Sequence, residues 1–420
     1  MKKLILPISI LFGLISCTES DQTITPAQTT LSLDSGYGSN PSVNFLTWVM
    51  VQSPQGEIVY TSEIFPGERL DLSELEEESF HLTLVSQKTN PTGDPIGPTN
   101  LETYTYVSPG RNYTFGLARR DLIEYPVQNA TFEVKVFDMQ GAKYGFMSSI
   151  NARHSYSNID NQPQGFLKLK KLVEDKETES FISAVDERGE VRYKFFIGGD
   201  PNEVYDFSFE EMSSFDYELV LENPQGDAQF SVYALREERD YYRQSFLLST
   251  SRIGPNRFTD GNFSFEYLNR FEKYQTTFRT LLEENGNYKW IFYEKVGDAP
   301  SSINIPYSEV VNIQNSSITN FQFTPISGAT RSVSIFKLLD GEDVKAWWTV
   351  HSGENSYSLN VADEVINQFS SLRDFPMTKA AQVSSIRSDY NYDTFIKNSL
   401  VELPSFQEYE ETYILVEDQK

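Results

Sequence analysis

The sequence predicts an all-β protein made of tandem β-sandwich modules of the immunoglobulin-like or transthyretin-like type. Three observations lead to this prediction. Apolar and polar residues alternate along most of the chain, which is the pattern of half-buried strands. No long stretch has a clean helical spacing of apolar residues. A strand–turn–strand pattern recurs at intervals of roughly 100 residues, which is the size of one sandwich domain.

The chain of 420 residues is rich in aromatic and acidic residues. Its 30 Phe and 24 Tyr supply the apolar surface that a core needs, so a disordered acidic chain is excluded. The net charge of −25 argues against a nucleic-acid partner, which would need a basic surface. One Cys excludes a disulfide framework, and three His argue against a His-rich metal site. We therefore expect no cofactor and no metal site.

The N-terminus has the pattern of a secretory signal. Lys2 and Lys3 precede an apolar run from Leu4 to Ile15, which is shorter than the roughly 20 residues of a membrane-spanning helix. The run ends in Leu14-Ile15-Ser16-Cys17, which resembles the bacterial lipobox. The resemblance implies that residues 1–16 are a lipoprotein signal peptide. It also implies that acyl chains such as palmitate are attached to Cys17 and hold the chain on a membrane.

The residues after Cys17 bear on location. Thr18 follows the Cys in place of the Asp that would signal inner-membrane retention. Glu19 and Asp21 resemble the acidic surface-export tether of Bacteroidetes lipoproteins. Residues 17–42 therefore combine the lipidated Cys with a flexible tether rich in Thr, Ser, Gln and Gly. The resemblance implies an outer membrane lipoprotein at the cell surface, with the periplasmic face as the alternative.

A hairpin pattern recurs in the rest of the chain. In each copy an alternating strand leads through a turn to a second strand, and glycine supplies the positive φ that tight turns need. The first strands are residues 48–52, 132–137, 230–235 and 333–338, and the second strands run through Tyr60, through Tyr144, from Tyr241 and through Trp347.

A second hairpin repeats later in the unit. Residues 181–189 align without a gap with residues 278–286, and both returning strands are aromatic. Residues 269–286 also have helical spacing, but this alignment favours a strand. A last strand then closes each unit, at Tyr217, Phe321 and Tyr413 in units two to four. The repeat predicts four β-sandwiches, which span residues 43–126, 127–226, 227–327 and 328–420.

The sequence contains no recognisable catalytic motif. It lacks a phosphate loop and a Gly-x-Ser-x-Gly elbow, and none of His81, His154 and His351 belongs to a His-Glu-x-x-His pattern. Residues 340–343 and 34–40 offer oxygen ligands for calcium, but they lack the Asp-x-Asp-x-Asp-Gly spacing, and hairpin turns are the simpler interpretation. We therefore assign no catalytic residue.

Two aromatic pairs are candidate ligand-binding residues. Trp347 and Trp348 are adjacent on a predicted strand, so their rings must point to opposite faces. Tyr241 and Tyr242 occupy the corresponding place in the third unit. An exposed ring of this kind can stack on the apolar face of a pyranose. The alternative is that these rings lie at an interface or are ordinary edge residues.

These features together predict a lipid-anchored envelope protein with a non-enzymatic binding or structural role, for which the ligand is a glycan or another envelope protein. The order of lipobox, tether and tandem sandwiches resembles the surface glycan-binding lipoproteins of polysaccharide-utilisation systems. This resemblance is architectural and assigns no binding residue. The alternative function is a lipid-anchored hydrolase that acts on glycans through an Asp/Glu pair.

Overall fold

The computed structural model describes residues 28–38, 44–117, 131–149, 154–156, 167–172, 179–197, 202–235, 245–251, 262–284, 287–375, 378–402 and 407–417. Strands dominate these residues, so the predicted all-β class is confirmed. The helical elements are short: η2 (Phe209–Glu211), η3 (Ile318–Asn320), α1 (Asp363–Gln368), η4 (Ser370–Leu372), α2 (Tyr392–Ile396) and η6 (Lys397–Val401). Within the described ranges, no helix is long and apolar enough to cross a membrane.

The first sandwich packs a three-stranded sheet, β4-β1-β7, on the four strands β3-β2-β5-β6. Strand β1 pairs antiparallel with β4 and parallel with β7. Leu31, Val49, Leu82 and Phe115 meet in its core. The strands are β1 (Thr30–Leu33), β2 (Asn44–Gln52), β3 (Ile58–Glu63), β4 (Arg69–Asp71), β5 (Phe80–Thr89), β6 (Thr99–Val107) and β7 (Asn112–Phe115).

The second sandwich repeats this pairing, with sheets β11-β8-β14 and β10-β9-β12-β13-β15. If the first seven strands of each sandwich are lettered A to G, both sandwiches have the sheets D-A-G and C-B-E-F, and in the second sandwich β15 adds to the edge of strand F. Immunoglobulin domains instead have sheets A-B-E-D and C-F-G. Of the two predicted sandwich types, the pairing therefore fits the transthyretin-like one. The strands are β8 (Thr131–Phe137), β9 (Ala142–Ser149), β10 (His154–Tyr156), β11 (Leu167–Leu172), β12 (Glu179–Asp186), β13 (Val191–Ile197), β14 (Val204–Ser208) and β15 (Ser213–Ser214).

The third and fourth sandwiches keep the C-B-E-F order, as β18-β17-β20-β21 and β25-β24-β27-β28. Their smaller sheets are β16-β19 and β22-β23-β26. The third contains β16 (Tyr217–Leu221), β17 (Asp227–Leu235), β18 (Ser245–Thr250), β19 (Phe263–Tyr267), β20 (Lys273–Glu284) and β21 (Asn287–Gly297). The fourth contains β22 (Asn312–Asn315), β23 (Phe321–Thr324), β24 (Arg331–Asp340), β25 (Asp343–Ser352), β26 (Ser356–Tyr357), β27 (Ala380–Ser388) and β28 (Tyr409–Glu417).

Most of the predicted hairpins are present. β2 pairs with β3, β17 with β18, β24 with β25, β12 with β13 and β20 with β21. Residues 273–284 form strand β20, in agreement with the preference for strand over helix. The loop at residues 340–343 is the turn between β24 and β25, with Gly341 at a φ of 64°.

One predicted hairpin is wrong. Strand β8, which includes residues 132–137, does not pair with β9; it pairs with β11 and β14, and β9 pairs with β10 and β12. Between them the chain turns through Asp138 (φ 60°) and Gly141 (φ 73°) and crosses to the other sheet. Alternation looks the same in either sheet of a sandwich, so spacing alone could not reveal the crossing.

Within single sandwiches, three strands are separated by a predicted boundary from the strands that they pair with. β1 falls within residues 17–42, the predicted tether, and yet pairs with β4 and β7. β16 precedes residue 227 and pairs with β19, and β23 precedes residue 328 and pairs with β26. The strands at Tyr217 and Phe321, which were expected to close units two and three, therefore belong to the following sandwiches.

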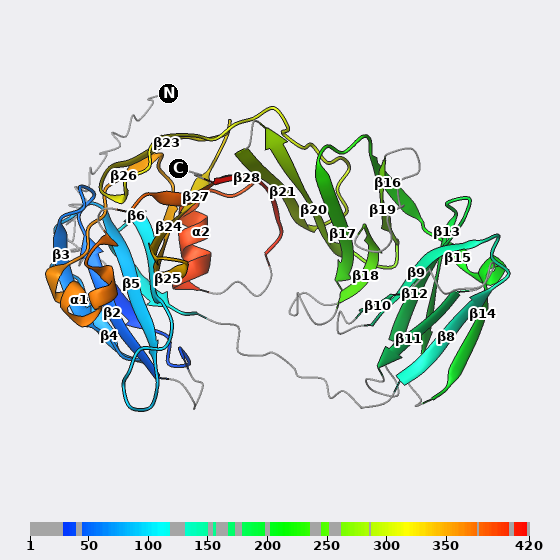
Figure 1. Ribbon diagram of the computed structural model, residues 1–420, viewed down its shortest axis with the longest axis horizontal. Helices are drawn as coiled ribbons and strands as arrows, with labels where there is room; N and C mark the ends of the chain where they lie inside the picture. The colour runs from blue at the N-terminus through cyan, green and yellow to red at the C-terminus, as the bar shows by residue number, and fades with distance from the viewer. Residues whose placement is uncertain are drawn as a thin grey trace, which may run out of the picture.

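The larger sheets of three sandwiches join into one twelve-stranded sheet, in the order β18-β17-β20-β21-β28-β27-β24-β25-β6-β5-β2-β3. β21 pairs antiparallel with β28, and β25 pairs parallel with β6. The first sandwich therefore lies beside the fourth, and the second lies at the other end of the arch, beside the third (Figure 1). There the Ser148 hydroxyl donates to the carbonyl of Leu247 at 3.2 Å.

The smaller sheets cover opposite faces of this long sheet. Trp348, Phe278 and Phe321 share one core, so the smaller sheets of the third and fourth sandwiches cover that face. Val49 and Leu84 of the first sandwich belong to a separate core on the other face. Over β17, β20, β21 and β28, none of the sheets that the structure describes covers this second face, which we call the open face.

Candidate functional site

Three aromatic rings lie side by side on the open face. Trp290 and Phe292 alternate along β21 with Ile291 and Tyr293, which are buried in the core. The rings of Trp290 and Phe292 are 5.9 Å apart at an angle of 25°. Phe292 stacks on Tyr413 of β28 at 4.4 Å and 13°. All three are half-buried, and we call Trp290, Phe292 and Tyr413 the aromatic shelf.

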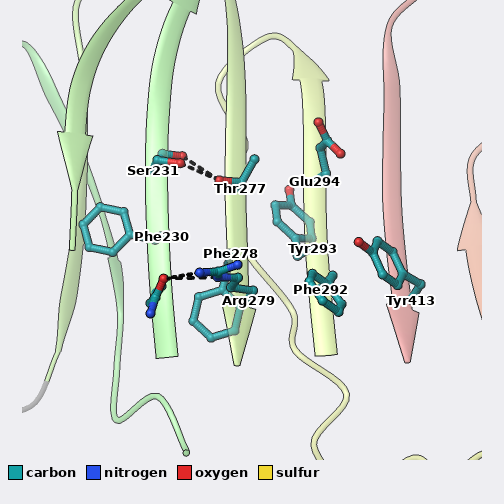
Figure 2. Close-up of a pocket in the computed structure, with 10 residues that line it drawn as sticks. Phe230, Ser231, Thr277, Phe278, Arg279, Phe292, Tyr293, Glu294 and Tyr413 are labelled. Atoms are coloured by element: carbon teal, nitrogen blue, oxygen red, sulfur yellow. Dashed lines mark hydrogen bonds between the residues drawn. The ribbon is translucent and has the colours of Figure 1, made fainter. Parts of the chain in front are cut away.

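Polar side chains lie beside Phe292 and Tyr413 of the aromatic shelf (Figure 2). The Arg279 guanidinium donates from Nε and Nη2 to Oε1 of Gln229 at 3.1 and 2.6 Å. The Ser231 and Thr277 hydroxyls are 2.7 Å apart. With Phe292, Glu294 and Tyr413, these residues line a shallow pocket of about 230 Å³ formed by β17, β20, β21 and β28. The Arg279 fork therefore has a fixed orientation beside the rings.

The ionisable groups of the pocket include both donors and acceptors. The pKa of the Tyr413 phenol is raised to about 12, first by burial and then by the negative charges of Glu294 and Glu411. The phenol therefore keeps its proton at neutral pH and can donate a hydrogen bond. The carboxylate of Glu294 accepts from Nε2 of Gln275 at 2.7 Å. A polyhydroxylated ligand would find both kinds of partner here.

An ion pair limits the site on the side of helix α2. Arg331 of β24 makes two bonds to Glu411, at 2.9 and 3.0 Å, and each side chain is about 10% exposed. The Arg331 guanidinium also lies 4.4 Å from the centre of the Phe395 ring of α2. Arg331 is paired with Ile386 of β27, and Ile386 is paired with Tyr413 of β28, so the side chains of Arg331 and Tyr413 lie on the same face of the sheet. Helix α2 therefore lies over the same face of the long sheet at β24, beside the open face.

The two predicted tryptophans lie on opposite faces of β25, as the sequence analysis expected. Trp348 is 0% exposed, and its Nε1 donates to Oγ1 of Thr103 at 2.7 Å across the junction of the fourth and first sandwiches. It is therefore a core residue that no ligand can reach. Trp347 is half-buried, and Nζ of Lys337 lies 4.8 Å from its ring centre. Trp347 is thus partly covered, and a ligand role for it stays a prediction.

Other predicted residues lie outside the described ranges, namely Cys17, Tyr241 and Tyr242. The residues of the aromatic shelf are not among the candidate ligand-binding residues that the sequence indicates. Trp290 and Phe292 belong there only to a predicted aromatic strand. The signal that could have found them is the run from Trp290 to Tyr293, which is apolar on both faces of the strand. Such a strand must either be covered twice or present rings to solvent.

No group of three or more His, Cys, Asp and Glu side chains within the described residues is arranged to hold a metal ion. The predicted acidic loop at residues 340–343 therefore forms part of no such group.

No family model and no curated protein matches this sequence. Among solved structures, the chain is similar to a Ca²⁺-stabilised adhesin that helps an Antarctic bacterium reach out and bind ice. The identity is 9%, 87% of this chain and 95% of that chain are covered, and the TM-score is 0.13. A second similar structure concerns host cell surface retention of a 1.5-MDa bacterial ice-binding adhesin, with 8% identity, coverage of 66% and 98%, and a TM-score of 0.12. At these TM-scores the likeness carries no argument about function.

Proposed function

We propose that this chain is a lipid-anchored, non-catalytic protein of the cell envelope that binds a carbohydrate on the aromatic shelf. The observation that supports the proposal is the half-exposed stack of Trp290, Phe292 and Tyr413, with Arg279 fixed beside it. Large half-exposed rings gathered on one surface are unusual for a chain with no further role there.

A pyranose ring fits the chemistry of this surface. One face of the ring carries C–H groups, which can stack on Phe292 or Tyr413, and its edge carries hydroxyls that both donate and accept. Arg279 and the Tyr413 phenol are donors, and Glu294 is an acceptor. Because Gln229 already fixes Arg279, little side-chain entropy is lost when a ligand hydroxyl binds.

The alternative of a glycan hydrolase needs two carboxyl groups that flank the bond to be cleaved, roughly 5 to 9.5 Å apart. Glu294 and Glu411 follow and precede Phe292 and Tyr413 by two residues on their strands, and they face each other across β21 and β28. Both project from the same face of one sheet, so they would lie on the same side of a bound sugar. Glu411 is also occupied by Arg331. The arrangement favours binding over hydrolysis.

Anchoring is the second part of the proposal, and it rests on the lipobox ending at Cys17. Strand β1 begins at Thr30. The 12 residues 18–29 would therefore separate the lipid from the first sandwich. Such a tether would hold the sandwiches close to the membrane that carries them.

A glycan array tests the binding proposal. The chain beginning at Thr18 retains every described residue. We expect it to retain at least one glycan, and Phe292→Ala to abolish that retention. The control is Phe65→Ala, which removes a ring that is 57% exposed and far from the open face, and which should bind like the wild type. Retention of no glycan, or equal retention by Phe292→Ala, would contradict the proposal.

A further inference from the structure

The open face carries an apolar stripe that continues beyond the aromatic shelf. Cross-strand pairing places Leu281 of β20 beside Trp290, and Trp290 beside Leu415 of β28. The same line continues across Ser384 of β27 to Val333 of β24. Leu281, Leu415 and Val333 are half-exposed. At about 4.8 Å per strand, the stripe from β20 to β24 is about 19 Å long.

The apolar stripe consists of the aromatic shelf with Leu281, Leu415 and Val333, and it is narrow. On β28 the residues of the open face are, in order, Tyr409, Glu411, Tyr413, Leu415 and Glu417. The stripe is thus two residues wide on β28, with a carboxylate on either side. Glu283 lies on the same border as Glu417, two residues beyond Leu281 on β20. An elongated apolar floor therefore has an acidic border on the side of Glu283 and Glu417, whereas on the other side Glu411 is paired with Arg331.

The carboxylates beside the stripe favour a neutral sugar polymer over an acidic one. A chain of uronic acids or sulfated sugars on the stripe would place its charges within about 10 Å of Glu283 and Glu417, where physiological salt does not fully screen repulsion. The overall charge of −25 adds to this repulsion. A neutral sugar chain meets no such penalty, and its hydroxyls can bond to the border carboxylates and to Arg279.

We propose that the ligand is a neutral, unbranched oligosaccharide of at least four sugar units that lies across the strands along the apolar stripe. The inference deepens the proposed function and rests on it. The strand spacing is close to the length of one hexose unit, so successive units can lie over β20, β21, β28 and the strands beyond. The width of two residues leaves room for one chain and no branch.

Binding measurements with glycans of defined length test the inference. The probes are gluco-, manno- and xylo-oligosaccharides of one to six units, with polygalacturonate as the acidic counterpart. For the series that binds, we expect affinity to rise at least tenfold from one to four units. Leu415→Ser should lower affinity for four units more than for one. Leu339→Ser, which changes an exposed leucine of β24 outside the stripe, should alter neither.

The borders have their own test. Glu283→Lys combined with Glu417→Lys should admit polygalacturonate, which the wild type should exclude. Equal affinity for one and four units, binding of polygalacturonate by the wild type, or binding of none of the probes would overturn the inference. If Phe292→Ala still loses binding of a single unit, only the length and charge of the ligand are refuted, and the proposed function stands. Far-UV circular dichroism and thermal unfolding of each variant establish that it folds.

Discussion

Lowering the pH tests whether His81 is held neutral where the first and fourth sandwiches meet. His81 of β5 is 0% exposed, and its Nδ1 accepts the backbone N–H of Tyr106 at 3.1 Å, so this nitrogen carries no proton. Burial lowers the pKa of His81 from 6.5 to about 4, and the carbonyl of Pro54 offsets only part of this effect. Tyr106 in turn donates its phenol to the carbonyl of Ser356 of β26, at 3.0 Å.

The sign and size of the effect follow from the two pKa values. In the unfolded chain His81 gains a proton below pH 6.5, whereas in the folded chain it stays neutral down to about pH 4. The unfolded state therefore binds more protons in this window. The contribution of His81 to the free energy of unfolding is complete above pH 6.5 and is lost as the pH falls towards 4. The loss between pH 7 and pH 4 amounts to about 3 kcal/mol.

Two measurements check this prediction. A proton NMR titration follows the imidazoles of the chain's three histidines, and His81→Gln identifies the signal of His81. Urea unfolding at pH 7 and pH 4 gives the change in free energy, which should be about 3 kcal/mol larger for the wild type than for His81→Gln. A His81 signal that titrates near pH 6.5, or identical pH dependence of the two proteins, would refute the reasoning.

Three further outcomes are expected. Trp348→Ala should lower the free energy of unfolding by about 3 to 5 kcal/mol, because it opens a cavity and leaves Thr103 without its donor, and an unchanged urea midpoint would contradict this. Arg331→Gln should cost about 3 to 5 kcal/mol, since Glu411 is left nearly buried without its cation; stability equal to that of the wild type would show that Glu411 needs no partner. Cys17→Ala should move the protein from the membrane fraction to the soluble fraction, and a variant that stays with the membrane would rule out the lipobox interpretation.

The hairpins were predictable because local alternation and turns specify them. Residues 181–189 and 278–286 aligned without a gap, and both segments form the E strand of a sandwich. The strand at residues 132–137 was also correctly identified, but its partner was not. Sheet membership depends on whether the chain crosses between sheets at Asp138, and the alternating pattern is identical in both cases.

The aromatic shelf depends on contacts that local patterns do not encode. Phe292 and Tyr413 belong to different sandwiches and meet only because β21 and β28 pair edge to edge. Any free edge strand can pair with any other, so the sequence does not reveal which edges join. The same holds for the parallel pairing of β25 with β6, which buries Trp348 beside Thr103. The prediction of opposite faces for the tryptophan pair needed only the two-residue period, and it was right.

The binding role of the aromatic shelf is tested most directly by calorimetric titration of a glycan retained on the array. The measurement compares the wild type, Phe292→Ala and the control Phe65→Ala. If the sugar stacks on the shelf, Phe292→Ala should weaken binding at least roughly tenfold, which corresponds to about 1.4 kcal/mol, while the variant stays folded at the temperature of the titration. Phe65→Ala should bind like the wild type. Equal affinity of the wild type and Phe292→Ala for the same glycan would contradict the account.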